Sequence, residues 1–418
     1  MTISRILGLV SLVIVAAAIV SVVTSWSDDD PGTTLSTSEA AGAAPASTSG
    51  SADASTPTTS AVATPAPAAT EPGAAATSAA PTRTTRSPSL PPRSATLVLT
   101  GEIEPDEAVQ RLARHYASGS AVARNFTPMF ADVAATIDAA ELAICHLEWP
   151  LSAASTTPAG SGPAELATAL AASGWDGCSV ASDRMDAVDP ITVAATVQIL
   201  ASAGVQAAGA ESRATMHDAG GIAVAHLAYT SNAPAGSASP LATQAVIADA
   251  GTARDAGAEF VIVSLHWGEE FEPEPTASQH EIAAALAASG EIDLVIGHHA
   301  HVVQPLELLQ GTWVAYGLGN FLTSQSPGCC GVASEDGVVL QVEIADTSAG
   351  VAVTEIGYLA TWVDRVHMKV HPVVDRLGDT GLPAWYRAVL RNSWERTDGT
   401  LLALGADQWG AGPLDELP

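Results

Sequence analysis

The sequence predicts an α/β fold for the chain beyond about residue 95, and two observations support this. Short apolar runs typical of β-strands alternate there with longer stretches of helical periodicity. Such alternation predicts parallel sheets covered by helices. In addition, five of the six strands expected before His301 are followed by a carboxylate or imidazole side chain. Ligands bind at the carboxyl ends of strands in sheets of this class, so the same pattern predicts a functional site.

The expected elements follow one another in a regular order up to His301. Strands are expected at residues 96–100, 142–147, 177–181, 222–229, 260–265 and 293–297. Helices are expected between them at residues 106–117, 130–139, 164–173, 191–203 and 277–288. The chain is long enough there for one large core.

The alternation of expected strands and helices ends after His301. Residues 303–309 and 312–316 predict a hairpin around Gln310-Gly311. Further strands are expected at 338–344 and 351–359, and a last helix around 385–394. We therefore expect a main domain at residues 95–378 and a C-terminal extension of the same domain at 379–418.

The N-terminal residues 1–26 contain an apolar run that follows Arg5 and precedes three aspartates. The run is long enough to span a bilayer, and the positive charge on its N-terminal side predicts that the rest of the chain lies outside the cytoplasm. A cleaved signal peptide is the alternative. The domain is then membrane-anchored in the first case and secreted in the second.

Residues 27–94 are dominated by Ala, Ser, Thr, Pro and Gly. A segment with so few large apolar side chains cannot offset its chain entropy by burial. The composition predicts a disordered linker between the membrane segment and the domain.

The formal net charge is −29, and Lys369 is the single lysine of the chain. Binding to nucleic acid requires lysine and arginine against the phosphates, so this composition argues against nucleic acid as a partner. Outside the cytoplasm, Cys145 and Cys178 on neighbouring expected strands could form a disulfide. For the adjacent Cys329 and Cys330, a vicinal bridge, separate partners and free thiols remain alternatives.

Seven polar residues at the expected strand ends are candidate ligands for Zn, Mn or Fe. His299 and His301 form the strongest pair, because residues two apart in an extended chain share a face while His298 points away. The structural alternatives are a buried pair for His146 and Glu148, and a helix N-cap for Asp183. The full candidate set is Glu102, His146, Glu148, Asp183, His266, His299 and His301.

Four segments resemble one protein family in order and with natural spacing. Residues 293–305 resemble the GHH-x-H-x-x-QP signature of CapA-type capsule (poly-γ-glutamate) synthesis proteins, a branch of the calcineurin-like metallophosphatase superfamily. Residues 261–272, 314–321 and 143–151 resemble the SLHWG, AYxLGNF and H-L-E-x-P-L segments of that family. The resemblance covers about residues 95–363. It implies two sheets in a sandwich flanked by helices, with one or two divalent metal ions at the strand ends.

The sequence departs from the family pattern at two positions of the expected metal site. Glu102 stands where the family has aspartate, which keeps the charge but moves the oxygens by about one methylene. Arg184 stands where the family has histidine. A guanidinium has no lone pair for a metal and stays protonated, so it cannot act as a proton donor. We expect Arg184 to bind an anionic substrate, with Trp267 and Glu269 as further substrate contacts; for Trp267 a place in the core is the alternative.

Two functions follow from these expectations. The first is a metal-dependent hydrolase-like protein in capsule, poly-γ-glutamate or cell-envelope polymer synthesis or export, acting on an anionic polymer or phosphoester. The second is a catalytically weakened component that binds polymer or assists assembly with a degenerate metal site. Other capsule-synthesis membrane components are expected partners in both cases.

Overall fold

The computed structural model describes residues 92–154, 157–210, 214–231 and 242–415. They belong to a compact unit at Thr84–Pro418. The expected membrane segment and nearly all of the expected linker lie outside the described residues. Within the described ranges, no helix is long and apolar enough to cross a membrane.

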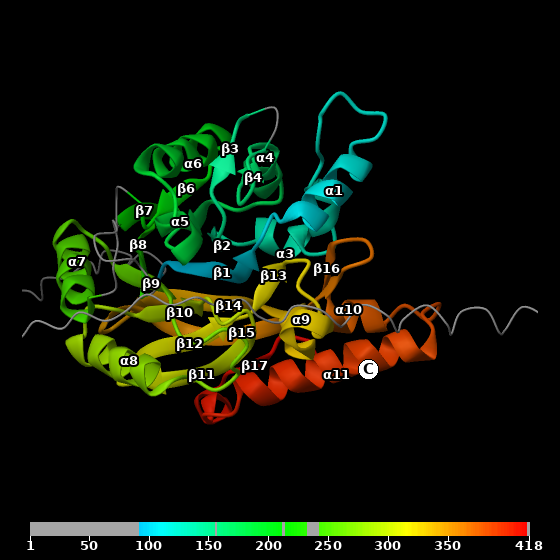
Figure 1. The fold of residues 1–418 in the computed structure, drawn as a ribbon. Helices are drawn as coiled ribbons and strands as arrows, with labels where there is room; N and C mark the ends of the chain where they lie inside the picture. The colour runs from blue at the N-terminus through cyan, green and yellow to red at the C-terminus, as the bar shows by residue number, and fades with distance from the viewer. Residues whose placement is uncertain (1–91, 155–156, 211–213, 232–241, 416–418) are drawn as a thin grey trace, which may run out of the picture. The chain divides into compact units, whose positions relative to one another are not determined.

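The larger sheet has nine strands and mixes parallel with antiparallel pairs (Figure 1). Its strand order is β16-β15-β14-β1-β2-β5-β6, with β13 added beside β1 and β17 beside β15. Strands β1, β2, β5 and β6 run parallel, whereas β14, β15 and β16 are antiparallel to their neighbours. The bounds are β1 Ser94–Ile103, β2 Leu142–Leu147, β5 Gly177–Ser179, β6 Gln206–Ala208, β13 Asn320–Leu322, β14 Asp336–Thr347, β15 Gly350–Asp364, β16 Lys369–Pro372 and β17 Gly412–Pro413.

The second sheet has six strands in the order β11-β12-β10-β9-β8-β7. Its four inner strands are parallel, and the edge strands β7 and β11 are antiparallel. The bounds are β7 Ala214–Ala219, β8 Ile222–Thr230, β9 Phe260–His266, β10 Leu294–His298, β11 Val303–Leu309 and β12 Thr312–Leu318. A separate pair joins β3 Leu151–Ser152 to β4 Gly162–Pro163.

The two sheets face each other across a continuous apolar core. Leu99 and Ile144 from the larger sheet pack in one cluster with Phe260 and Ile296 from the smaller one. A second cluster lies under α1–α4 and α6, and a third lies under α7 and α8. The expected sandwich of two sheets with flanking helices is therefore present.

Local sequence explains where several helices begin or end. The Asp106 side chain caps α1, and a capping box joins Thr276 to Gln279 at the start of α8. Gly290 ends α8 with a positive φ that a residue without Cβ adopts readily. The helices are α1 Glu107–Tyr116, α2 Thr127–Phe130, α3 Ala134–Asp138, α4 Glu165–Ala172, α5 Asp183–Asp186, α6 Pro190–Ala203, α7 Thr243–Asp255, α8 Ala277–Ser289, α9 Pro327–Cys330, α10 Val373–Leu377 and α11 Ala384–Leu401.

Two helix expectations differ from the structure. The helix expected at 130–139 is instead two short helices, α2 and α3, separated by a turn at residues 131–133. Helix α2 begins at Thr127, earlier than expected, with Pro128 in its first turn, where proline is well suited. The sequence reading also missed α7, whose apolar residues are mostly alanine and give little amphipathic contrast.

Both ends of the folded domain are tied to the sheets. Arg93, assigned to the linker by its composition, donates hydrogen bonds to Glu259 and Asp346 and so joins the two sheets before β1 begins. The C-terminal extension packs its helix α11 against β14 and β15, where Arg396 and Ser393 bond Asp336. Both cysteine pairs are disulfides: Cys145–Cys178 joins β2 to β5, and Cys329–Cys330 is vicinal.

The contact between α11 and β14 predicts a pH-dependent contribution to stability. Burial raises the pKa of Asp336 to about 6, although Arg396 and Ser393 oppose the change. From about pH 4 to about pH 6 the folded chain therefore holds a proton that the unfolded chain has released, so stability falls as the pH rises. We expect the difference in unfolding free energy between wild type and Asp336→Asn to fall by about 3 kcal/mol across this window. Denaturant melts at several pH values measure it, and a constant difference would contradict the prediction.

Candidate metal centre

The candidate ligands gather where the parallel strands of the two sheets end. Glu102 is the second-last residue of β1 and pairs in register with His146 of β2. His266 and His298 end β9 and β10 and pair in register with each other. Glu148 and Asp183 follow β2 and β5 in the chain. The sequence expectation that these strand ends converge is met by the fold.

Two glycines allow the strands to approach one another at this place. A Cβ at Gly101 would collide with the carbonyl oxygen of Gly319, and one at Gly297 would collide with the carbonyl oxygen of Tyr316. The glycines that precede Glu102 and His298 are therefore required by the close packing of backbones.

The first group of candidate ligands contains Glu102, Glu148 and His301, all buried. One donor atom from each lies within 4.8 Å of the others. His301 Nδ1 is 2.8 Å from Glu102 Oε2, and His301 Nε2 is 3.9 Å from Glu148 Oε2. Two carboxylates and an imidazole can hold one divalent ion.

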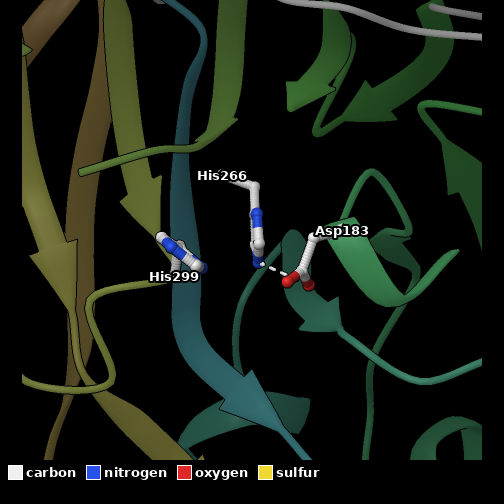
Figure 2. A group of neighbouring side chains, drawn as sticks. All are labelled: Asp183, His266 and His299. Atoms are coloured by element: carbon white, nitrogen blue, oxygen red, sulfur yellow. Dashed lines mark ion pairs between the residues drawn. The ribbon is translucent and has the colours of Figure 1, made fainter. Parts of the chain in front are cut away.

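The second group contains Asp183, His266 and His299 (Figure 2). Their donor atoms also lie within 4.8 Å of one another, with His266 Nε2 3.8 Å from Asp183 Oδ1. In Figure 2 the His266 ring points at the Asp183 carboxylate, and His299 lies on its other side. Asp183 follows Ser182, whose hydroxyl caps α5, so the N-cap role considered for Asp183 falls to its neighbour.

The two groups adjoin each other. The backbone N–H of His299 donates to Glu102 Oε1 at 2.5 Å, so one carboxylate contacts both histidine positions. The centroids of the His299 and His301 rings are 6.2 Å apart, and those of His266 and His299 are 4.5 Å apart. The arrangement offers two neighbouring cation positions.

The expectation that His299 and His301 share a face of an extended chain is wrong. His299 and His301 both have positive φ, 86° and 55°, so the chain leaves β10 in left-handed turns and is not extended. His299 and His301 nevertheless enter one group each, and His298 enters neither. His298 instead stacks on His146 with ring centroids 4.1 Å apart.

His146 lies beside the two groups and is a member of neither. Its ring centroid is 5.5 Å from that of His266, and it is fully buried. Burial lowers the pKa values of both His146 and His298, and nearby imidazoles lower that of His146 further. Both rings are therefore neutral. The role of His146 as a ligand stays a prediction.

Burial and neighbouring charges both shift the pKa values of the first group. Burial raises the pKa of Glu148, and the charges of Glu104 and Glu102 raise it further. Burial also acts against ionised Glu102 and protonated His301, but their mutual attraction outweighs it, so the pKa of Glu102 is lowered and that of His301 is raised. A cation bound between these two buried carboxylates would offset the cost of ionising both.

Unpaired buried atoms test whether a metal ion fits. In the two groups, Glu148 Oε2, Asp183 Oδ1 and His266 Nε2 are among the buried atoms of the described residues that have no hydrogen-bond partner. Buried polar atoms without a partner are costly. All three are ligand atoms suited to Zn, Mn or Fe, and they belong to the two groups above. The residues present therefore fit one or two divalent ions.

Two contributors were missed in the sequence reading. Glu104 is buried two residues after Glu102 and accepts a hydrogen bond from the Thr323 hydroxyl. Asn320 Oδ1 is 3.0 Å from His301 Nδ1, and its Nδ2 donates to the backbone oxygen of His301. Asn320 thus helps to fix the orientation of the candidate ligand His301. Asn320 belongs to the Gly-Asn-Phe motif of the sequence, but its contact with His301 can be seen only once the chain is folded.

The three expected substrate contacts have different surroundings. The Arg184 side chain is 42% exposed, its Nε donates to Glu148 Oε1 at 2.8 Å, and its guanidinium lies 4.8 Å from the centre of the Trp149 ring. Trp267 is 1% exposed and donates to the backbone oxygen of Tyr316, so its side chain is a core residue. Exposed Glu269 and Trp267 are among the residues that line a pocket of about 300 Å³.

Comparisons with solved structures give likenesses of low sequence identity. A novel phosphatase from Mycoplasma pneumoniae is 11% identical, with a TM-score of 0.43 over 64% of this chain and 94% of that one. The calcineurin-like phosphoesterase YfkN from Bacillus subtilis is 10% identical, with a TM-score of 0.41 over 73% of this chain and 97% of that one.

Sequence comparisons identify relatives over part of the chain. The PGA biosynthesis protein CapA of Bacillus subtilis (strain 168) is 41% identical over 68 residues, which are 16% of this chain and 18% of that protein. The capsule biosynthesis protein CapA of Bacillus anthracis is 31% identical over 94 residues, 22% of either protein. The matched segments thus span about a fifth of these relatives. The family model described as "Bacterial capsule synthesis protein PGA_cap" matches residues 96–325, more than half of the chain, and the protein belongs to this family.

Proposed function

We propose that this protein acts outside the cytoplasm in the synthesis or export of a capsule or cell-envelope polymer of the poly-γ-glutamate type. In this proposal a metal-dependent hydrolase-like site processes an anionic polymer or a phosphoester. The N-terminal apolar run with its preceding Arg5 supports the extracytoplasmic location, as a membrane anchor or a cleaved signal. The family match and the CapA relatives support the link to the polymer.

One observation carries the hydrolase-like site: two adjoining groups of three donors lie next to a half-exposed arginine. Glu102, Glu148 and His301 would hold one ion, and Asp183, His266 and His299 a second. Divalent ions, when bound, lower the pKa of water and polarise a carbonyl or phosphoryl oxygen. The donor set suits Zn, Mn or Fe.

The chain's own residues supply orientation and charge. Arg184 donates a hydrogen bond from Nε to Glu148, and within the described residues it makes no other hydrogen bond, so the terminal nitrogens of this partly exposed side chain are available beside the first group. A guanidinium in this position binds a carboxylate or phosphate oxygen in a fixed orientation. Trp149 under the guanidinium plane restricts its movement.

The second function, binding or assembly without efficient catalysis, is favoured by the same arginine. Family members carry a histidine where this chain has Arg184, and a guanidinium cannot protonate a leaving group. Under this alternative the metal groups and Arg184 retain anionic polymer without cleaving it. The expected partners, other membrane components of capsule synthesis, are shared by both functions.

Purified full-length protein separates the two functions. We expect it to bind soluble poly-γ-glutamate and to hydrolyse an aryl phosphodiester when Mn²⁺ or Zn²⁺ is restored after chelation. Polymer binding without metal-dependent hydrolysis would support the assembly function. If the protein showed no polymer binding and no hydrolysis with either of these metals, the proposal as a whole would be overturned.

A further inference from the structure

Three residues with an unusual backbone conformation lie at or beside the candidate metal centre. Phe271, His299 and His301 are three of the five non-glycine residues with positive φ in the described parts of the chain. A positive φ is uncommon outside glycine and is an outlier for a bulky side chain. Such conformations gather at functional sites, because the surrounding structure must maintain them. The two histidines are candidate ligands, whereas Phe271, with φ 66°, carries no donor atom for a metal.

Two hydrogen bonds of the main chain hold Phe271 in this conformation. Its backbone N–H donates to the carbonyl oxygen of Ala300 at 2.7 Å, and Ala300 stands between the two histidines in the chain. Directly after Phe271, the carbonyl oxygen of Glu272 accepts a hydrogen bond from Gln304 Nε2 at 2.8 Å, and Gln304 in turn accepts one from buried Gln279. The segment after β9 is therefore attached by hydrogen bonds to the turn that follows β10.

The Phe271 side chain lies against His301. The ring centroids are 5.8 Å apart and the ring planes are inclined by 27°, which is an offset stack. Phe271 is half-buried, whereas His301 is 1% exposed, so the phenyl ring contributes to the burial of the imidazole. The imidazole nitrogens face other groups: Nδ1 is 2.8 Å from Glu102 Oε2, and Nε2 is 3.9 Å from Glu148 Oε2. Polar contacts thus hold the edge of this imidazole, and the phenyl ring holds one of its faces.

A turn alone does not require phenylalanine at this position. Glycine adopts a positive φ without steric cost, and Gly268, earlier in the same segment, does so with φ 90°. We propose that Phe271 is a positioning residue for the first group: its ring fixes the plane of the His301 imidazole and keeps water from that face. The apolar surroundings of a metal site control solvent access, and groups that orient a ligand raise its affinity for metal. This inference rests on the metal-binding role proposed for His301.

The affinity for Mn²⁺ tests the proposal, measured by titrating chelated full-length protein in competition with a metal-binding indicator dye. The ion to follow is the one that His301→Ala no longer binds. We expect Phe271→Gly and Phe271→Leu to bind this ion about 10-fold to 100-fold more weakly than wild type, because neither side chain can stack on the imidazole. Phe271→Tyr, which keeps the ring, should retain the wild-type affinity. An ion in the second group should bind as in wild type in all three variants.

Gln310→Gly is the matched control, because it also replaces a side chain at a positive φ, 51°, but in the exposed turn between β11 and β12. It should leave the affinity unchanged. An unchanged affinity in both Phe271→Gly and Phe271→Leu would overturn the positioning role and leave the metal-binding role of His301 in place. Equal loss in Phe271→Tyr, or equal weakening of both ions, would also overturn it, since the stacked ring would then not be the cause. A wild-type protein that bound no metal would overturn the positioning role and the metal site together.

Discussion

His301→Ala should lower metal-dependent hydrolysis by about 10³-fold and remove one metal ion from the protein. His301 is the imidazole of the first group and contacts Glu102 at 2.8 Å, so its loss leaves two buried carboxylates without a third donor. A metal ion stabilises charge in the transition state by several kcal/mol, and each 1.4 kcal/mol is a factor of ten in rate. Metal content and kcat/KM of the full-length protein measure the two effects.

Two further variants test which of the neighbouring histidines hold metal. His299→Ala should also release one ion, because His299 belongs to the second group. His298→Ala should change mainly stability, because its ring stacks on His146 and enters neither group. Equal metal loss from all three variants, in proteins that still melt cooperatively, would contradict the exclusion of His298 from both groups.

Strand positions were predictable because burial leaves a strong pattern in the sequence. Residues 142–147 form β2 with the expected bounds, and each of them is buried. The β11–β12 hairpin was predictable from Gln310-Gly311, and both residues adopt a positive φ in its tight turn. Antiparallel β7, which pairs with β8 across Gly220-Gly221, carries fewer apolar residues and was not expected.

The proximity of most candidate ligands was predictable from the sequence, whereas their geometry was not, and their binding of metal stays a prediction. Strand ends of a parallel sheet converge, so Glu102, His266 and Asp183 could be expected near one another from their places in the chain. The backbone conformation at His299 and His301 could not be predicted from the sequence, because a positive φ is uncommon for residues other than glycine. At His299 it accompanies a contact that only the fold creates, the hydrogen bond from the His299 N–H to Glu102. Glu102 also shows why the longer side chain is suitable: its two oxygens reach His299 and His301 together.

Arg184→Ala should raise KM, or the Kd for soluble poly-γ-glutamate, by about 10-fold to 100-fold. The guanidinium is held by Glu148 and lies over Trp149, so its terminal nitrogens are already oriented for an anionic group. Hydrogen bonds to charged groups contribute about 1.5–3 kcal/mol. Arg184→Lys should recover only part of the loss, because an ammonium cannot make the paired contact. Arg114→Ala, which removes an exposed arginine of α1 paired with Glu107, is the matched control and should leave KM and Kd unchanged.

Arg184→His separates substrate binding from proton donation at the same position. Histidine supplies the acid that this chain lacks, and general acid catalysis accelerates reactions by about 10²–10⁴-fold. We therefore expect kcat on a phosphodiester to rise by about 10²-fold while KM rises as in Arg184→Ala. A rise in kcat would show that the metal groups are competent and that arginine limits the chemistry. An unchanged KM in Arg184→Ala would instead mean that the guanidinium serves only to neutralise Glu148, and the substrate contact assigned to it would be wrong.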